Sequence, residues 1–318
     1  MIVAVLYIVL ATLKGKAKPI HAFCSLESLE ILCSSEKIFL DGTFKLAPKL
    51  FCQLYTLHGS FKGKIFPLVY SFLPNKTKAT YLTLFKNLKI QAEKFGFKFQ
   101  PPSAMLDFEA GAINALEEVF PFINVKGCYF HYSQAIWRKV QELGLVKNYV
   151  NSEETRTWIR RIIALPLVPM DEVSEAFLLL LEDAPQQTRA VRKMIDYVVD
   201  TWLDENNATF QMDSWNHFET NDNLRTNNNV EGWHSKLSKR GLPPHPNIFS
   251  LVKVLQDIEA ENEAERRTLR SRKQKSTQKK QYRVLNERLA LLKQRLIDNN
   301  IQLKAYMDAV AYLASTKK

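Results

Sequence analysis

The sequence contains little cysteine and has no apolar stretch long enough to cross a bilayer. Four cysteines among 318 residues are too few for a disulfide-stapled scaffold and are typical of a reducing compartment. The apolar residues 1–13 fall short of the roughly 20 that a membrane helix needs. Lysines follow this run instead of preceding it, which is the reverse of a secretory signal. We therefore expect no membrane partner, and interpret residues 1–13 as a packed strand or helix, or as the ragged start of a truncated product.

Acidic residues are absent from one segment that holds most of the excess charge. The 44 Lys and Arg residues outnumber the 33 Asp and Glu residues, which gives a formal net charge of +11. Nine basic residues lie between positions 266 and 283, so the rest of the chain carries only +2 (11 minus 9). Such a stripe can bind DNA phosphates without reading sequence and can act as a nuclear localisation signal, although a solvated helix face or a basic tail also explains it. The candidate contacts to a DNA backbone are Arg266, Arg267, Arg270, Arg272, Lys273, Lys275, Lys279, Lys280 and Arg283.

The first half of the chain alternates between strand-like and helix-like segments. Runs rich in Phe, Ile, Leu, Val and Tyr predict three strands, at Lys37–Asp41, Leu50–Leu57 and Ile65–Leu73. Helical spacing of apolar residues then predicts a helix over residues 81–95. The pattern continues as strand, helix, strand and helix over Ser103–Glu109, Ala110–Phe120, Ile123–Phe130 and Ser133–Leu143. This order predicts an α/β protein with a mixed sheet and flanking helices.

The second half is predicted to be helical, and the chain shows no internal repeat. Apolar spacing is purely helical over Asn151–Asp204, whereas the polar segment Asn206–Asn229 predicts a long loop. Leucines from Leu285 to Leu296 form a stripe that is a candidate coiled-coil contact. We predict five parts: an N-terminal segment (1–36), the first part of the core (37–145), a helical insertion with its loop (146–225), the completion of the core (226–262) and a basic, Leu-striped helical tail (263–318).

Three carboxylates stand at the ends of predicted elements. Asp41 ends the first strand, Asp107 lies near the end of an apolar strand, and Glu231 opens a helix. A carboxylate in an apolar strand is costly to bury unless it is paired or binds a cation, and Mg²⁺ prefers oxygen ligands. Each residue also has a structural explanation, as a turn residue, a helix N-cap or part of a capping box. The order of the three at the ends of elements favours a hard-cation site.

Several short motifs surround these carboxylates. They are DGTF at Asp41, QLYTLHG at Gln53–Gly59, PLVYSFLPNKTKATY at Pro67–Tyr81, DFEAGAINA at Asp107–Ala115, CYFHYSQAIWRK at Cys128–Lys139, RTNNNVEGWH at Arg225–His234 and HPNI at His245–Ile248. Together they resemble the motifs of Mutator-like element (MULE) transposases, over residues 37–255. The resemblance implies an RNase H-like fold with an all-helical insertion and a helical C-terminal tail.

The resemblance also implies an activity and a site. Its catalytic and metal-binding triad is Asp41, Asp107 and Glu231, holding two Mg²⁺ (or Mn²⁺) ions that serve DNA cleavage and strand transfer in the nucleus. The interval of 124 residues between Asp107 and Glu231 exceeds that of a minimal RNase H fold, and the helical insertion accounts for the excess. The implied partner is DNA, both transposon ends and target, and paired-end chemistry makes a homodimer a candidate assembly.

Four further residues are candidate accessory groups. Cys128 and His131 form the family's Cys-x-x-His pair, but other Cys and His residues form no second pair, so we do not expect structural zinc. His234 lies one helical turn after Glu231 and could reach the DNA or the surroundings of the metal. Glu109 shares a strand face with Asp107 and is the spare carboxylate.

One departure from the family keeps a second function open. Family members usually carry a zinc-finger domain before the first Asp, and the 40 residues before Asp41 contain no such finger. The sequence is therefore consistent with a truncated copy, a domesticated derivative or an incomplete gene model. The alternative to a transposase is a domesticated DNA-binding or chromatin protein without catalysis.

Overall fold

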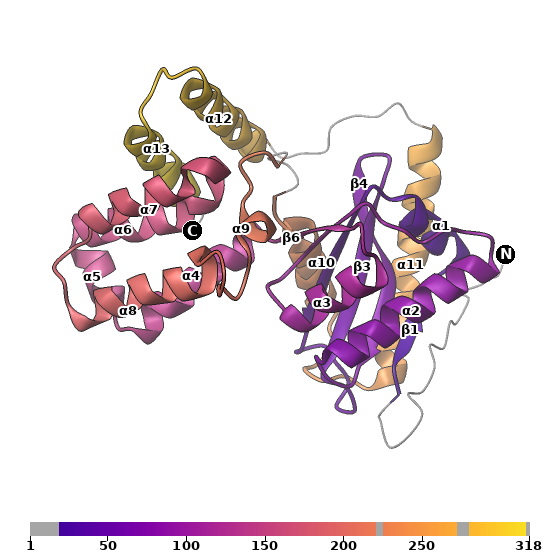
Figure 1. Cartoon of the computed structure of the whole chain (residues 1–318). Coiled ribbons are helices and arrows are strands. Elements are labelled where there is room, and N and C mark those ends of the chain that lie inside the picture. Colours follow the sequence, from indigo (N-terminus) through magenta and orange to yellow (C-terminus); the bar gives the residue numbers. More distant parts are fainter. Residues whose placement is uncertain (1–18, 221–224, 272–279, 316–318) are drawn as a thin grey trace. The chain divides into compact units, whose positions relative to one another are not determined.

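The computed structural model describes residues 19–220, 225–271 and 280–315, whose contacts form two compact units (Figure 1). The first unit contains residues 19–125 and 227–271, and the second contains the described residues of 126–226 and 280–315. The elements of the first unit are β1 (His21–Phe23), α1 (Leu26–Ser34), β2 (Lys37–Thr43), β3 (Gln53–Phe61), β4 (Lys64–Leu73), α2 (Lys78–Lys94), β5 (Ser103–Leu106), α3 (Ala110–Val119), β6 (Asn124–Gly127, which reaches into the second unit), α10 (Asn228–Ser238) and α11 (Ile248–Ser271).

A six-stranded mixed sheet with the order β1-β4-β3-β2-β5-β6 forms the centre of the first unit. Strands β2, β3 and β4 pair antiparallel, and β5 pairs parallel with β2. The parallel register aligns Phe39 with Met105. Because both strands run in the same direction, the positions two residues further on are Asp41 and Asp107, which brings these carboxylates to the same end of the sheet.

Helices cover both faces of this sheet. Side chains alternate between the faces of a strand, so Tyr55 and Leu57 of β3 point to one face and Thr56 and His58 to the other. Tyr55 packs against Tyr81 of α2 in a tilted arrangement, with ring centroids 5.1 Å apart, on the face that α2 and α3 cover (Figure 1). His58 packs edge-on against Trp233 of α10 at 5.4 Å on the opposite face, where α11 also lies. The sheet is therefore buried on both sides, as a mixed α/β fold requires.

The second unit is helical. Its elements are α4 (Tyr129–Glu142), α5 (Val146–Asn151), α6 (Glu153–Ala164), the 3₁₀ turns η1 (Leu165–Leu167) and η2 (Met170–Glu172), α7 (Val173–Glu182), α8 (Arg189–Val198), the π-helical turn η3 (Val199–Leu203), α9 (Met212–Trp215), α12 (Lys280–Ile297) and α13 (Leu303–Ser315). Trp158 of α6 donates its indole N–H to the Leu180 carbonyl of α7 at 2.8 Å. The phenol of Tyr306 in α13 donates to the Leu167 carbonyl at 2.5 Å. The second of these contacts joins segments 139 residues apart in the chain.

The structure confirms the predicted fold class, an α/β fold consistent with RNase H, and the helical character of residues 151–204. The sequence patterns missed β1 and α1, and the predicted strands Ser103–Glu109 and Ile123–Phe130 are shorter, at β5 and β6. Residues 1–13 lie outside the described residues. The described helices include none that is long and apolar enough to span a membrane.

The predicted C-terminal tail is not a separate part of the molecule. Helix α11 carries its first section into the first unit as far as residue 271, and α12 and α13 belong to the second unit. Leu289 and Leu296 of the leucine stripe are buried there, because α12 packs on α13. The stripe therefore contributes to the core of a single chain, and its buried leucines are not an exposed coiled-coil surface.

Candidate metal centre

Asp41 lies on β2 and its side chain points to the face covered by α10. Its side chain is 9% exposed. Oδ1 accepts the backbone N–H of Gly42 at 2.8 Å, and Oδ2 lies 3.3 Å from Nδ1 of His234 on α10. A side chain at Gly42 would collide with Gln53, since a Cβ there would lie 2.2 Å from its amide oxygen. The Asp-Gly pair thus combines a fixed carboxylate with a close approach of β2 and β3.

Asp107 follows the last residue of β5 and is a buried carboxylate beside other carboxylates. Burial, followed by the neighbouring charges of Asp41 and Glu109, raises the pKa of Asp107 to about 7, and Lys76 opposes this shift. Asp107 Oδ1 is buried and finds no hydrogen-bond donor among the described residues. A buried carboxylate oxygen that lacks a hydrogen-bond donor is costly, and a bound cation would compensate this cost. The three neighbouring carboxylates offer the oxygen ligands that a hard cation such as Mg²⁺ prefers.

Glu231 stands in the first turn of α10, and this helix is attached to β2 next to Asp41. The buried side chain of Asn227 donates from Nδ2 to the Leu40 carbonyl at 3.1 Å, while its own carbonyl accepts the N–H of Glu231 at 3.0 Å. Residues three apart share a helix face, so Glu231 and His234 lie on the same side of α10. Because His234 contacts Asp41, the Glu231 helix begins at the carboxylate site.

Glu109 has partners of its own. Tyr81 donates its phenol to Oε1 at 2.5 Å, and Lys76 Nζ lies 2.6 Å from Oε2. Gln53 in turn donates to the Tyr81 oxygen at 2.6 Å. The ammonium of Lys76 also sits over the Phe44 ring, 4.7 Å from its centroid. Glu109 therefore holds a lysine beside Asp107.

The accessory pair Cys128 and His131 lies in the second unit. Cys128 is the buried residue that precedes α4, and His131 is half-buried in the first turn of that helix. Trp215 and Trp233 are both buried. The sequence analysis did not identify Thr56, Lys76 or Asn227 as part of the site. For Thr56 a signal exists, because Thr56 and His58 are polar residues spaced two apart in an otherwise apolar strand.

The proposed basic stripe needs a correction. Arg266 is fully buried, where its guanidinium pairs with Glu259 at 2.9 Å and Glu27 at 3.0 Å, so it cannot contact a DNA backbone from this position. Arg267 pairs with Glu263, and Arg270 pairs with Glu27 at 2.7 Å. The first part of the stripe therefore attaches α11 to α1, because Arg266 and Arg270 both pair with Glu27 of α1. Arg283 is exposed and 3.6 Å from Glu287. Arg272, Lys273, Lys275, Lys279 and the side chain of Lys280 lie outside the described residues.

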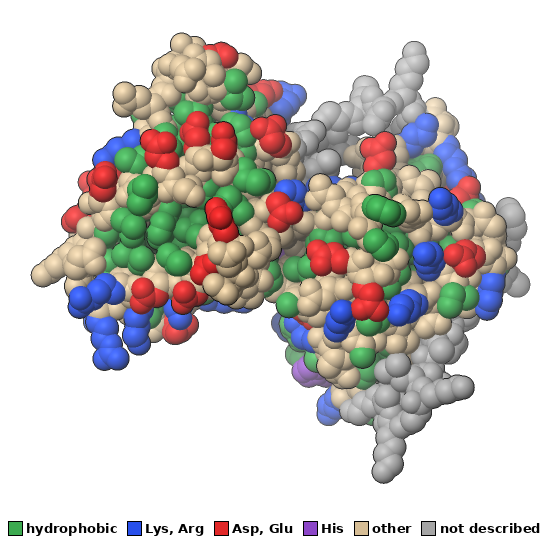
Figure 2. All heavy atoms as spheres, in the orientation of Figure 1, with side chains coloured by type: hydrophobic (Ala, Val, Ile, Leu, Met, Phe, Trp, Pro, Cys, Tyr) green, Lys and Arg blue, Asp and Glu red, His purple; other side chains and the backbone are tan. Residues whose placement is uncertain are grey.

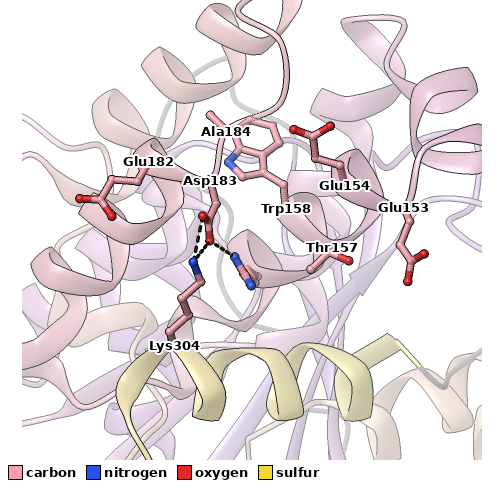
Figure 3. A pocket seen from close by; sticks show the side chains of 9 residues that line it. Glu153, Glu154, Thr157, Trp158, Glu182, Asp183, Ala184 and Lys304 are labelled. Carbon is pink, nitrogen blue, oxygen red and sulfur yellow. Dashed lines mark hydrogen bonds and ion pairs between the residues drawn. The ribbon is translucent and has the colours of Figure 1, made fainter.

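The second unit has a hollow of its own, shown in Figure 3. Acidic side chains of α6 and α7 line it, among them Glu153, Glu154 and Glu182. Asp183 is held there by Arg161 at 2.5 Å and by Lys304 at 2.7 Å. No sequence-predicted site residue lines this hollow.

A mixed sheet that brings two carboxylates to the same end of neighbouring parallel strands is consistent with an RNase H-like fold. Residues 37–135 match the family model of the MULE transposase domain. The match contains Asp41 and Asp107, and Glu231 lies beyond it. A comparison with curated proteins gives no match.

Proposed function

We propose that this chain is the catalytic core of a transposase that cleaves and rejoins DNA strands with Mg²⁺. The observation that carries the proposal is the β2–β5 register, which pairs Phe39 with Met105, two residues before Asp41 and Asp107, within the residues that match the MULE domain. The negative charges of Asp41 and Glu109 raise the pKa of Asp107, which agrees with a short distance between these carboxylates. The attachment of α10 next to Asp41 supports Glu231 as the third carboxylate.

The proposal gives each carboxylate a role. Asp41 and Asp107 would bind or bridge two Mg²⁺ ions (or Mn²⁺), and Glu231 would hold the second. The ions would supply an activated water and neutralise the charge that develops on the phosphate oxygens. Burial of Asp41 and Asp107 excludes bulk water from one side of the site, which strengthens the electrostatic interactions there.

Two successive displacements at phosphorus would make up the reaction. In the first, a water oxygen bonds to phosphorus and the P–O3′ bond breaks, which leaves a 5′-phosphate and a free 3′-OH at the element's end. In the second, this 3′-OH bonds to a phosphorus of the target strand and loses its proton, and a new target 3′-OH departs. Each step is an in-line exchange of oxygens on phosphorus that needs no external energy source.

The DNA would lie along two basic segments that follow Asp41 and Glu231. Residues 42–52 and 232–250 contain five Lys and Arg residues and no Asp or Glu. His245 joins the segments, because its backbone N–H donates to the Lys45 carbonyl at 2.8 Å and its Nδ1 lies 3.0 Å from the Ala47 carbonyl. Positive charge next to the carboxylates would attract phosphates toward the reaction site. DNA as substrate places the protein in the nucleus under this proposal.

A nicking assay on supercoiled DNA tests the function, with and without Mg²⁺. Wild type should nick the plasmid only with the ion, and Asp107→Asn should reduce nicking by more than 100-fold because it removes a ligand charge. Asp171→Asn, an exposed acid of the second unit, is the matched control and should nick like wild type. Undiminished nicking by Asp107→Asn would exclude this mechanism. DNA binding that is independent of divalent ions, with no nicking in any variant, would instead identify a DNA-binding or chromatin protein without catalysis.

A further inference from the structure

Strand β3 carries two buried polar side chains, Thr56 and His58, on the face that α10 covers. Thr56 is 0% and His58 is 1% exposed. Neither residue can reach bulk water, so each needs hydrogen-bond partners inside the protein. These two residues lie next to the candidate metal centre, because Thr56 stands opposite Asp41 in the β2–β3 ladder.

A continuous line of polar contacts runs from His58 to Asp41. His58 Nε2 lies 3.0 Å from Thr56 Oγ1, and the same hydroxyl oxygen lies 3.4 Å from Nε2 of His234. The other ring nitrogen of His234, Nδ1, lies 3.3 Å from Asp41 Oδ2. The line therefore leads from the sheet interior through α10 to one carboxylate oxygen.

The chemistry of the groups favours one direction for the hydrogens along this line. Burial lowers the pKa of His58, with a further contribution from nearby His234, so His58 is neutral and carries one ring hydrogen. If His58 donates to Thr56, the single hydroxyl hydrogen of Thr56 has two acceptors at 3.4 Å, the Asp41 backbone carbonyl and Nε2 of His234. An Nε2 that accepts leaves the hydrogen of His234 on Nδ1, facing the Asp41 carboxylate. In the reverse order, a bare Nδ1 would face a carboxylate oxygen, which places two acceptors together.

We propose that Thr56 and His234 are positioning residues that orient the Asp41 carboxylate through this hydrogen-bond line. The inference rests on the proposed function in that Asp41 is taken as a metal ligand. With Gly42 N–H on Oδ1 and His234 on Oδ2, each oxygen has one fixed donor and retains a lone pair for a cation. His234 lies on the same helix as Glu231, so one contact sets the rotamer of Asp41 relative to that helix.

The first readout is the tautomer of His234 in the metal-free full-length chain. Imidazole nitrogen NMR on protein labelled with ¹⁵N-histidine observes the six histidines, and His234→Asn and His58→Gln identify the two signals. At pH 7.5 we expect hydrogen on Nε2 of His58 and on Nδ1 of His234. Hydrogen on Nε2 alone of His234, which leaves Nδ1 bare, would overturn the proposal. This measurement needs no catalytic activity, so a failure of the proposed nuclease function does not affect it.

The second readout uses a matched pair of variants at Thr56. Thr56→Val keeps the shape and removes the hydroxyl, whereas Thr56→Ser keeps the hydroxyl. We expect Thr56→Val to erase the Nδ1 preference of His234 and to weaken Mn²⁺ binding about tenfold, as the loss of an outer hydrogen bond does at metal sites. Thr56→Ser should keep both properties. If Thr56→Val leaves the tautomer and the Mn²⁺ affinity unchanged, the positioning role is refuted.

Discussion

The phenol of Tyr81 donates to the carboxylate of Glu109 at 2.5 Å and accepts from the Gln53 amide at 2.6 Å. One hydroxyl therefore connects α2, β3 and the residue that precedes α3. Its two partners are both largely buried, with Gln53 1% exposed and the Glu109 side chain 13% exposed. The arrangement fixes Glu109, which in turn holds Lys76 beside the carboxylates.

We predict that Tyr81→Phe lowers the free energy of unfolding by about 1–3 kcal/mol, because it removes the donor to Glu109 Oε1 and the acceptor of the Gln53 amide. Urea denaturation followed by circular dichroism measures this change. The neighbouring Tyr55 is a matched control, since its hydroxyl is buried with no hydrogen-bond partner among the described residues. Tyr55→Phe should be neutral or slightly stabilising. Equal effects of the two substitutions would show that the Tyr81 hydroxyl makes no net contribution.

The metal-free protein should lose stability as the pH rises, and Asp107 should cause part of this loss. Its pKa is about 7 in the folded chain, against 3.8 for an ordinary aspartate, so the folded state retains a proton that the unfolded state releases between these values. Stability from this group is complete below pH 4 and falls as the pH rises to 7. Asp107→Asn should therefore stabilise the metal-free chain at pH 8, by up to about 4 kcal/mol, and change little at pH 4.

Thermal melts at pH 4 and pH 8 test this prediction, with Mg²⁺ as a second variable. An ion that binds the folded state raises the melting temperature. We expect Mg²⁺ to stabilise wild type at pH 8 and to have much less effect on Asp107→Asn. A pH-independent effect of the substitution would mean that Asp107 ionises normally in the folded chain.

Much of the fold could be predicted because its signals are local. Strands β2, β3 and β4 follow runs of apolar residues, and the helices follow 3.6-residue periodicity. Asp41 and Asp107 could be proposed because each ends an apolar strand. What brings them together, the Phe39–Met105 register, is a contact between segments 66 residues apart that periodicity cannot supply. Strand β1 was missed because its three residues carry too little pattern, and the nine-residue helix α1 was missed as well.

The error over Arg266 has a similar origin. Charge spacing along one segment does not reveal which acids fold against it, and the partners of Arg266 include Glu27, 239 residues away in the chain. Likewise, nothing in the sequence around Lys76 indicates Glu109 as its partner. Composition locates a charge, but only tertiary contacts decide whether that charge faces solvent.

Arg266 should be a major contributor to the attachment of α11. Its side chain is 0% exposed, and Glu259 is 4% exposed and accepts hydrogen bonds from Ser25 and Ser28. Removing the guanidinium leaves buried negative charge unpaired, so Arg266→Met should destabilise the chain by about 3–5 kcal/mol. Arg267→Met is the control, because Arg267 is 62% exposed and its pair with Glu263 is worth little. A change within about 0.5 kcal/mol for both variants, measured by urea denaturation, would contradict the structural role of Arg266.

The basic segments beside the carboxylates should carry the DNA affinity. Lys45, Lys49, Lys236 and Lys239 are exposed on the α10 side of the first unit. A matched set, Lys86, Lys89, Lys94 and Lys98, belongs to α2 and the residues after it, on the opposite face of the sheet. On that face, which Figure 2 shows, basic side chains lie among acidic ones. Both sets of lysines lie in the first unit, and replacing either set removes four positive charges.

Exchanging each set for glutamine therefore separates a local contact from an effect of net charge. Each phosphate contact adds about 0.9 to the slope of log affinity against log salt concentration for duplex DNA. The four substitutions on the α10 side should lower this slope by about 2–4, whereas the α2 set should lower it by less than about 1. Fluorescence anisotropy with a labelled duplex at several salt concentrations measures both. Equal reductions would show that binding follows net charge alone, and a larger reduction for the α2 set would place the DNA on the opposite face of the sheet from Asp41.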